Sequence, residues 1–327
     1  MPTRRALLAL AGAAPLAPAL APFPARAQEA WPARPVTVLV PFVAGGPSDI
    51  VARAAANRMG QSIGQPVVVE NRPGANGEVA ARVAMRAAPD GHTLMVGSIG
   101  VWAINAALRP NLGYDPVKDF TPLVLAVTTP NVLVVNRDHP ARDVAGLIGW
   151  LKESGGRASY STSGVGSSDQ LTTELFKLRT GTEITHVPYT GGAAAATDLI
   201  AGNVSLSFQN LGTVAGHIEG GRLRALMVTS ERPHPVLPGV PTAEQAGLRD
   251  FVVTSWQSFM APAGMAPPLR DRVAAALRDS LLHAETRAAL ERIGFDVVPT
   301  TPDAYRSFQE AEIARWREVI RAARIVA

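Results

Sequence analysis

Short apolar runs rich in β-branched residues alternate with helix-patterned segments along most of this 327-residue chain. The first run, at 36–40, reads Val-Thr-Val-Leu-Val, and the segment at 48–63 then places apolar side chains at helical spacing. Two more strands, at 67–69 and 93–96, flank a helical pattern over 78–88. Strands that alternate with helices in this way predict an α/β protein with a parallel sheet.

The pattern continues along the rest of the chain. Between apolar runs at 123–127 and 132–135, residues 128–131 predict either a turn or a crossover, and we place a domain boundary there. Beyond it, the sequence predicts helices over 143–153, 168–178, 193–201, 268–283, 284–293 and 302–323, strands at 158–161, 184–187, 205–208, 223–229 and 295–298, and a long extended segment at 251–259. The second half is therefore predicted to be another α/β unit with a helical end.

Residues 1–27 have the pattern of an export signal. Arg4 and Arg5 precede the apolar run at 6–10, and the segment ends in Ala-Arg-Ala, which fits an A-x-A cleavage site. Four prolines between 15 and 24 disfavour a membrane-spanning helix. The paired arginines fit a twin-arginine signal but also occur in ordinary Sec signals, so the export route stays open. The sequence predicts an exported protein, which in a bacterium works in the periplasm.

The composition excludes several classes of protein. Lys and Arg total 31 against 27 Asp and Glu, and three of the cations lie in the first 27 residues, so the rest of the chain is nearly neutral. This balance does not predict nucleic-acid binding. The absence of Cys excludes disulfides, thiolate zinc sites and iron–sulfur clusters. The six histidines lack metal-ligand spacing, and no nucleotide or hydrolase motif occurs, so we predict neither a metal nor a cofactor.

Four predicted strand-to-helix loops share one chemistry. Glycines and hydroxyl residues precede the helix starts at 41–49, 97–100, 161–168 and 189–192. In open parallel sheets, ligands bind in the crevice beyond the carboxyl ends of the strands. Small side chains let a ligand approach the backbone, and a helix N-terminus offers free N–H groups with a partial positive charge. Such loops bind anions without Lys or Arg.

The same loops also have a purely structural interpretation. Glycine and serine at strand–helix junctions act as turns and N-caps. Ser48 and Ser168 are candidate caps, and Asp49 suits a first helical turn on electrostatic grounds alone. Both interpretations stay open at this point. Trp256 is a further candidate, because it lies where the chain returns between the two predicted units.

Eight collinear stretches span nearly the whole chain after the predicted signal. They are WPARPVT at 31–37, VPFVAGGPSD at 40–49, GQPVVVENRPGA at 64–75, APDGHTL at 88–94, YDPVKDF at 114–120, HVPY at 186–189, DLIAG at 198–202 and VPT at 240–242. Together they resemble the periplasmic solute receptors of tripartite tricarboxylate transporters, often called the Bug family.

This resemblance implies an α/β, two-domain fold of the periplasmic-binding-protein type II, with two crossover segments and a ligand cleft between the domains. Domain 1 is then expected at 28–128 and 254–327, and domain 2 at 129–253. The resemblance also implies a monomeric, non-enzymatic receptor that delivers a small organic carboxylate to integral membrane transporter subunits. A receptor that serves a signalling protein is the leading alternative. An exported hydrolase with Ser163 or Ser167 as nucleophile is a third interpretation.

The resemblance further implies which residues bind the ligand. One wall of the cleft is expected to contain Phe42, Gly46, Ser48, Asp49, Ser98 and Asn105. The other wall is expected to contain Ser163, Gly166, Ser167, Thr190 and Asp198.

The chain departs from its relatives at one place in these loops. Many relatives have a histidine soon after the Gly-x-Gly-Ser loop, where this chain has Gln170. A neutral amide cannot become an imidazolium, so a ligand preference tied to that histidine does not carry over. The neighbouring Asp169 would disfavour a second carboxylate if it faced the cleft, and as the second residue of a helix it has the alternative of pointing to solvent.

Overall fold

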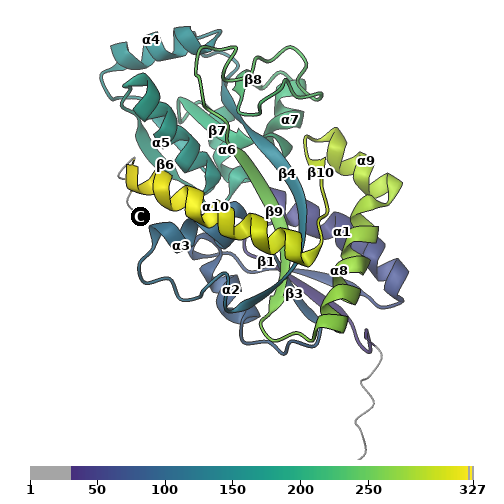
Figure 1. Cartoon of the computed structure of the whole chain (residues 1–327). Helices are drawn as coiled ribbons and strands as arrows, with labels where there is room; N and C mark the ends of the chain where they lie inside the picture. Colours follow the sequence, from purple (N-terminus) through teal and green to yellow (C-terminus); the bar gives the residue numbers. More distant parts are fainter. Residues whose placement is uncertain (1–30, 323–324, 326–327) are drawn as a thin grey trace, which may run out of the picture. The chain divides into compact units, whose positions relative to one another are not determined.

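A mixed ten-stranded sheet organises the part of the chain that the computed structural model describes, residues 31–322 and residue 325 (Figure 1). The predicted export signal lies outside the described residues. The strand order is β2-β1-β3-β9-β4-β7-β5-β6, and β8 and β10 also pair with β4. The strands are β1 (Val36–Val40), β2 (Val67–Asn71), β3 (Thr93–Ser98), β4 (Phe120–Asn136), β5 (Ser159–Thr162), β6 (Thr185–Pro188), β7 (Leu206–Asn210), β8 (Leu223–Val228), β9 (Thr254–Pro262) and β10 (Asp296–Val297).

Helices follow most of the strands, as the sequence predicts. They are α1 (Pro47–Ile63), α2 (Glu78–Ala84), α3 (Asn105–Leu108), α4 (Val144–Ser154), α5 (Ser168–Thr180), α6 (Gly192–Ile200), α7 (Leu211–Glu219), α8 (Pro267–Leu282), α9 (Ala284–Arg292) and α10 (Pro302–Ala322). The sequence did not predict α7, whose two glycines weaken its helical pattern. Elsewhere the helix ends follow local signals: α1 has a proline in its first turn, and its C-cap Gly64 has a left-handed φ of 71°.

The prediction of a parallel sheet is confirmed for only part of the structure. β1 pairs in parallel with β2 and β3, and β5 pairs in parallel with β6 and β7. The long strands β4 and β9 instead run antiparallel to each other, and β9 is antiparallel to β3 as β4 is to β7. The two parallel groups are therefore joined by an antiparallel pair, which a strand–helix alternation does not reveal.

β4 is one continuous strand through the region where a turn or a crossover was predicted. Its first part pairs with β9 up to Pro130, and its last part, from Asn131, pairs with β7. Near the end of the first part, buried Thr129 donates its hydroxyl to the carbonyl of Gly294 at 2.8 Å. The crossover interpretation is the correct one, because the polar residues between the two apolar runs are hydrogen-bonded inside the molecule.

Alternating side chains place a core on each face of the sheet. Val38 and Val40 pack in one cluster with α1, α8 and α9, whereas Leu39 packs on the opposite face in a cluster that includes α10. In the other group of strands, alternate residues of β4 likewise pack into cores on opposite faces of the sheet. Leu133 packs toward α4 and Val134 toward α7. Both parallel groups are thus covered by helices on two faces, which leaves their strand ends and loops available for a ligand site.

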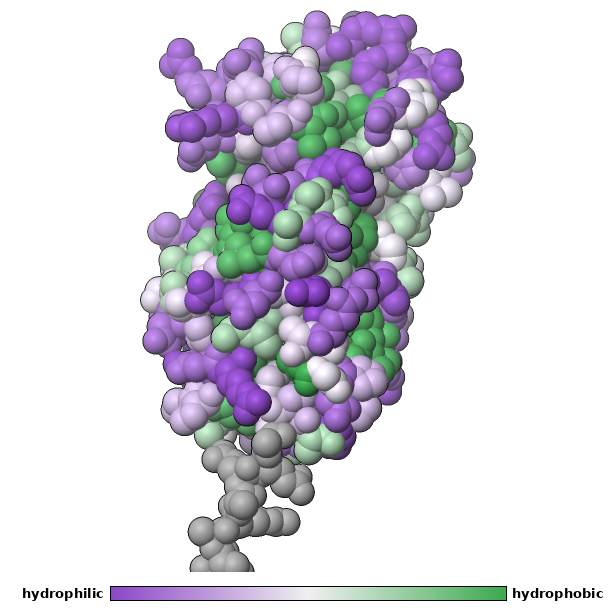
Figure 2. Space-filling view, turned by 90° about the vertical axis from the view of Figure 1, so that its right-hand side faces the viewer, coloured by the Kyte–Doolittle hydropathy of each residue, from purple (hydrophilic) through white to green (hydrophobic). Residues whose placement is uncertain are grey.

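Among the described residues, no helix is long and apolar enough to cross a membrane. The face shown in Figure 2, on which α8 and α9 lie, mixes hydrophilic residues with small, separate hydrophobic patches.

Candidate functional site

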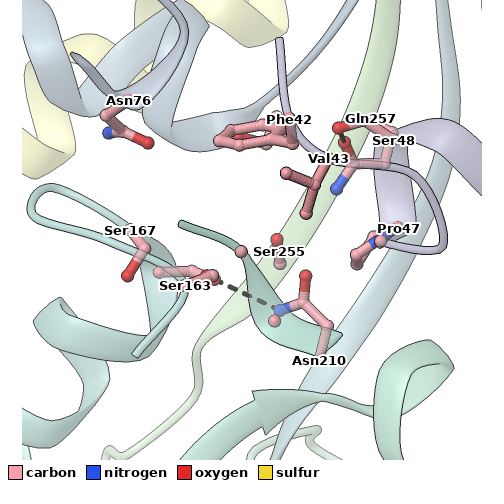
Figure 3. Close-up of a pocket in the computed structure, with 15 residues that line it drawn as sticks. Phe42, Val43, Pro47, Ser48, Asn76, Ser163, Ser167, Asn210, Ser255 and Gln257 are labelled. Atoms are coloured by element: carbon pink, nitrogen blue, oxygen red, sulfur yellow. Dashed lines mark hydrogen bonds between the residues drawn. The ribbon is translucent and has the colours of Figure 1, made fainter. Parts of the chain in front are cut away.

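A pocket lies beyond the carboxyl ends of strands from both parallel groups, where the predicted loops meet (Figure 3). Together with its open mouth it holds about 430 Å³ of empty space. β1 and β3 lead into one side of it, and β5 and β7 lead into the other. It is lined by Phe42, Val43, Gly46, Pro47, Ser48, Asn76, Ser98, Ser163, Ser167, Ser168, Gly191, Gly192, Asn210, Ser255 and Gln257.

Four helices begin at this pocket. Its lining includes the N-caps of α1, α5, α6 and α7, which are Gly46, Ser167, Gly191 and Asn210. Three of these helices have no side chain capping the N-terminus; α5 alone is capped, by the hydroxyl of Ser167. Helix N-termini carry a partial positive charge and free N–H groups, whereas none of the lining side chains is charged. Four helices therefore point the positive ends of their backbone dipoles toward the pocket.

The carboxylate of Asp49 holds the loop between β1 and α1 through hydrogen bonds. Asp49 is buried in the first turn of α1 and accepts the N–H of Gly45 at 2.9 Å, Nε of Arg53 at 2.9 Å and Nδ2 of Asn71 at 3.0 Å. Nδ2 of Asn71 also donates to the carbonyl of Phe42. Burial raises the pKa of Asp49, but these hydrogen bonds outweigh it and leave the pKa below its ordinary value. Asp49 positions the loop and does not line the pocket.

We expect Asp49→Asn to make the protein less stable at neutral pH, by roughly 1 to 3 kcal/mol, because the amide cannot accept on both of its former oxygens. A lowered folded-state pKa stabilises the protein above the unfolded-state pKa of about 4 and loses that contribution as the pH falls through the folded-state value. The two proteins should therefore converge in acid. Urea unfolding at several pH values measures this, and equal stability at pH 7 would contradict the role given to Asp49.

On the opposite wall, Asp169 holds the loop after β5. Its Oδ2 accepts the backbone N–H of Ser163 at 2.9 Å and also the hydroxyl of Ser163, and its Oδ1 accepts the hydroxyl of Ser168 at 3.2 Å. Burial raises the pKa of Asp169 above its ordinary value, against these hydrogen bonds. Asp169 is fully enclosed behind Ser163, so it neither points to solvent nor lines the pocket.

Gln170, the residue that departs from the family pattern, also supports this loop. Its Oε1 accepts the backbone N–H of Gly166 at 2.7 Å, and its own N–H bonds the hydroxyl of Ser167 at 3.3 Å. Ser167 is thus the N-cap of α5, and the prediction of Ser168 as the cap is wrong. The prediction of Ser48 as a cap is wrong too, because its hydroxyl donates to Gln257 at 2.6 Å.

Strand β9 presents alternate residues to the pocket and to the core. Ser255 and Gln257 line the pocket, and the intervening Trp256 points away, where its Nε1 donates to Oε2 of Glu312 on α10 at 2.9 Å. Successive side chains of a strand lie on opposite faces. Trp256 is therefore a core residue that holds the strand, and its two neighbours are the site residues.

A wider outer pocket adjoins the first and shares Phe42, Val43, Asn76 and Ser163 with it. Arg109 is the one charged residue in the lining of this outer pocket. Its guanidinium donates to the carbonyl of Ala75 at 3.2 Å and lies 3.6 Å from Glu78. The charge of this guanidinium is thus partly neutralised by Glu78.

The structure brings six of the eleven predicted binding residues together in the inner pocket: Phe42, Gly46, Ser48, Ser98, Ser163 and Ser167. Thr190 lines the outer pocket. Asp49, Asn105, Gly166 and Asp198 line neither. Asn105 supports Asn76 through a 3.0 Å hydrogen bond, and Asp198 accepts the hydroxyl of Tyr189 and Nδ2 of Asn203. As ligand contacts, the predicted residues remain predictions.

Several lining residues were missed by the sequence analysis. The most informative are Asn76, Asn210, Ser255 and Gln257. A usable signal existed for two of them, because Ser255 and Gln257 alternate with apolar residues in a segment that is otherwise a buried strand. For Asn210, the signal was an Asn at the end of a buried strand, directly before the unpredicted helix α7.

Comparison with known proteins places this chain among receptors. Residues 51–325 match the family described as the tripartite tricarboxylate transporter family receptor. The structure resembles that of R. palustris Rpa4515 with adipate, with a TM-score of 0.88 and 36% identity over 90% of this chain and 99% of the other. It also resembles MatC of Rhodopseudomonas palustris with bound malate (TM-score 0.84, 33% identity, 89% and 100% covered) and the periplasmic binding protein BugD (0.87, 30%, 90% and 99%). These matches confirm the predicted two-domain, periplasmic-binding-protein-like fold.

Proposed function

Because this chain belongs to the tripartite tricarboxylate transporter receptor family, we propose that it captures a small organic carboxylate in the inner pocket and delivers it to the membrane subunits of such a transporter. The observation that carries this proposal is the convergence of four helix N-termini on a pocket without charged side chains. Members of the family are receptors, and the chain is a binding protein rather than an enzyme.

Neutral donors suit reversible capture of an anion. Gln257 uses its Oε1 to accept from Ser48, which leaves its Nε2 available to a carboxylate. The hydroxyl proton of Ser167 is also available, since its oxygen caps α5 by accepting from Gln170. The structurally similar Rpa4515 and MatC carry adipate and malate, which are both dicarboxylates. A second carboxylate on the ligand of this chain would find the guanidinium of Arg109 at the mouth.

We further propose that 28–128 with 254–327 and 129–253 act as two domains that close on the ligand. β4 and β9 cross between the two parallel groups of strands and are the natural hinge. Closure would exclude water and create a surface that a membrane partner distinguishes from the open form. The protein is proposed to be exported to the periplasm by the Sec or the twin-arginine route. After residues 1–27 are removed, it is proposed to act there as a monomer.

Thermal unfolding tests the proposal. The chain from Gln28 onward is refolded to remove bound ligand and is then scanned against mono- and dicarboxylates, amino acids and neutral solutes, with sodium sulfate and sodium chloride as controls for a general anion effect. A ligand at about a hundred times its Kd adds roughly 2.7 kcal/mol, which raises the unfolding midpoint by several degrees. A shift with neutral solutes and with no acid would contradict carboxylate capture.

A receptor that serves a signalling protein instead remains the alternative partner assignment. Uptake of the identified acid by cells that lack this chain separates the two. Lost uptake that returns with the chain supports the transporter, whereas unchanged uptake supports signalling.

A further inference from the structure

We propose that the carboxylate ligand also carries a hydrogen-bond donor, a hydroxyl or an amino group, and that Oδ1 of Asn210 accepts it. This inference rests on the proposed function and narrows its substrate class to hydroxy- or amino-substituted carboxylic acids. Asn210 ends β7 and occupies the N-cap position of α7 without a capping hydrogen bond, and its side chain lies at the base of the pocket in Figure 3, below Ser255.

A chain of hydrogen bonds fixes which way the amide of Asn210 faces. It starts at the carbonyl of Ser168, which can only accept, and which receives the hydroxyl of Thr172 at 2.7 Å. With its proton used, the hydroxyl of Thr172 accepts Nδ2 of Asn131 at 2.7 Å. The remaining oxygen of Asn131 must then accept, and it receives Nδ2 of Asn210 at 2.5 Å. Reversing any amide in this chain would place two donors or two acceptors against each other.

Nδ2 of Asn210 has no hydrogen left for a ligand. Its second hydrogen is donated to the hydroxyl of Ser168 at 3.2 Å, drawn as a dashed line in Figure 3. Its Oδ1 points from the other side of the amide into the pocket, and no hydrogen bond to it is found among the described residues. Asn210 is 7% exposed. An acceptor that faces the pocket and has no protein partner is satisfied by water or by the ligand.

The hydroxyl oxygen of Ser163 is a second acceptor that faces the pocket, because its proton is already donated within the protein. The hydroxyl of Ser163 donates to Oδ2 of Asp169, an oxygen that also accepts the backbone N–H of Ser163. The Ser163 oxygen therefore offers lone pairs rather than a proton to the pocket. The free donors described above, on Ser167 and Gln257, suit a carboxylate, whereas the oxygens of Asn210 and Ser163 suit a hydroxyl or an ammonium group. A plain dicarboxylate would leave these two acceptors desolvated and unpaired.

Matched acids test the inference on the protein from Gln28 onward. Each set has one carbon skeleton and differs only at C2: succinate, L-malate and L-aspartate; glutarate, L-2-hydroxyglutarate and L-glutamate; adipate, L-2-hydroxyadipate and L-2-aminoadipate. In the set that binds, we expect a substituted acid to bind about tenfold or more tightly than the plain one, measured by calorimetry. Equal or tighter binding of the plain acid would overturn the inference and leave the proposed function standing. Binding of no acid in this series or in the wider panel above would overturn both.

Two variants test whether the amide of Asn210 causes the preference for a substituted acid over the plain one. Asn210→Ala removes the acceptor, and Thr172→Val removes the hydroxyl that orients the amides without touching the pocket. In both, the ratio of affinities between the substituted and the plain acid should fall toward one. Asn136→Ala is the control, because Asn136 makes two amide hydrogen bonds to Leu199 and Ile200 away from the pocket. It should keep the wild-type ratio even if it lowers stability. A wild-type ratio in the folded variant at 210 or 172 would contradict the assignment.

Discussion

Trp256→Ala should lower the free energy of unfolding by about 3 to 5 kcal/mol, and it should also weaken ligand binding. Trp256 is 1% exposed and packs edge-on against Tyr305 and Phe308 of α10, with ring centroids 6.1 and 5.4 Å away. Truncation leaves a large cavity between β9 and α10, and it takes one of two indole donors from the buried carboxylate of Glu312. Binding suffers because the flanking Ser255 and Gln257 depend on this anchor for their position.

Urea unfolding and calorimetry with the identified acid measure both effects. Trp150→Ala is the matched control, because Trp150 is half-buried on α4, away from the pocket, where it packs against His139. It should cost less stability and leave the affinity unchanged. Trp256→Phe should keep most of the packing and lose only the hydrogen bond to Glu312. If Trp256→Ala costs no more than Trp150→Ala, the indole is not the anchor of β9.

The fold could be predicted to the extent that it depends on local pattern. Each parallel strand is a short apolar run, and each long helix has a continuous helical spacing, so these elements were placed nearly where the structure has them. The antiparallel crossing of β4 and β9 could not be predicted, because it depends on pairings between residues more than a hundred positions apart, such as Thr128 with Trp256. The resemblance to a known family supplied what the pattern could not.

The same distinction between local pattern and long-range topology applies to the residues of the site. Loop residues such as Ser48 and Ser163 could be proposed because small polar residues before a helix have a local meaning. Asn210 and Gln257 reach the pocket through the sheet topology, and the acceptor role inferred for Asn210 comes from a relay through Asn131 and Thr172 that no spacing encodes. Asp49 shows the converse: a polar residue in a predicted ligand loop whose hydrogen bonds all go to the protein.

Gly166→Ala should weaken ligand binding at least about tenfold, although Gly166 does not line the pocket. Gly166 has a left-handed φ of 79°, and an added Cβ would lie 2.9 Å from Nδ2 of Asn76 and 3.2 Å from Oδ1 of Asn105. These residues belong to the opposite wall. On that wall a Cβ on Gly100 would lie 3.0 Å from the carbonyl of Gly166, so the two walls meet here without space for a methyl group. The methyl group would therefore push apart the segments that carry Asn76 and Ser167.

The loop cannot relieve this contact by moving backward. The N–H of Gly166 is held by the buried amide of Gln170, and the loop is tied again at Ser163 by Asp169. The substitution also strains the backbone, because a left-handed residue with a Cβ costs about 1 to 2 kcal/mol. Gly181→Ala separates the two effects. Gly181 caps the other end of α5 with a φ of 63°, and no atom lies within 4 Å of an added Cβ. Gly181→Ala therefore has only the backbone strain and no steric contact. If both variants lose similar stability but only Gly166→Ala loses affinity for the ligand, closure of the two walls at Gly166 is required for binding. If the two variants bind the ligand with equal affinity, closure at Gly166 is not required.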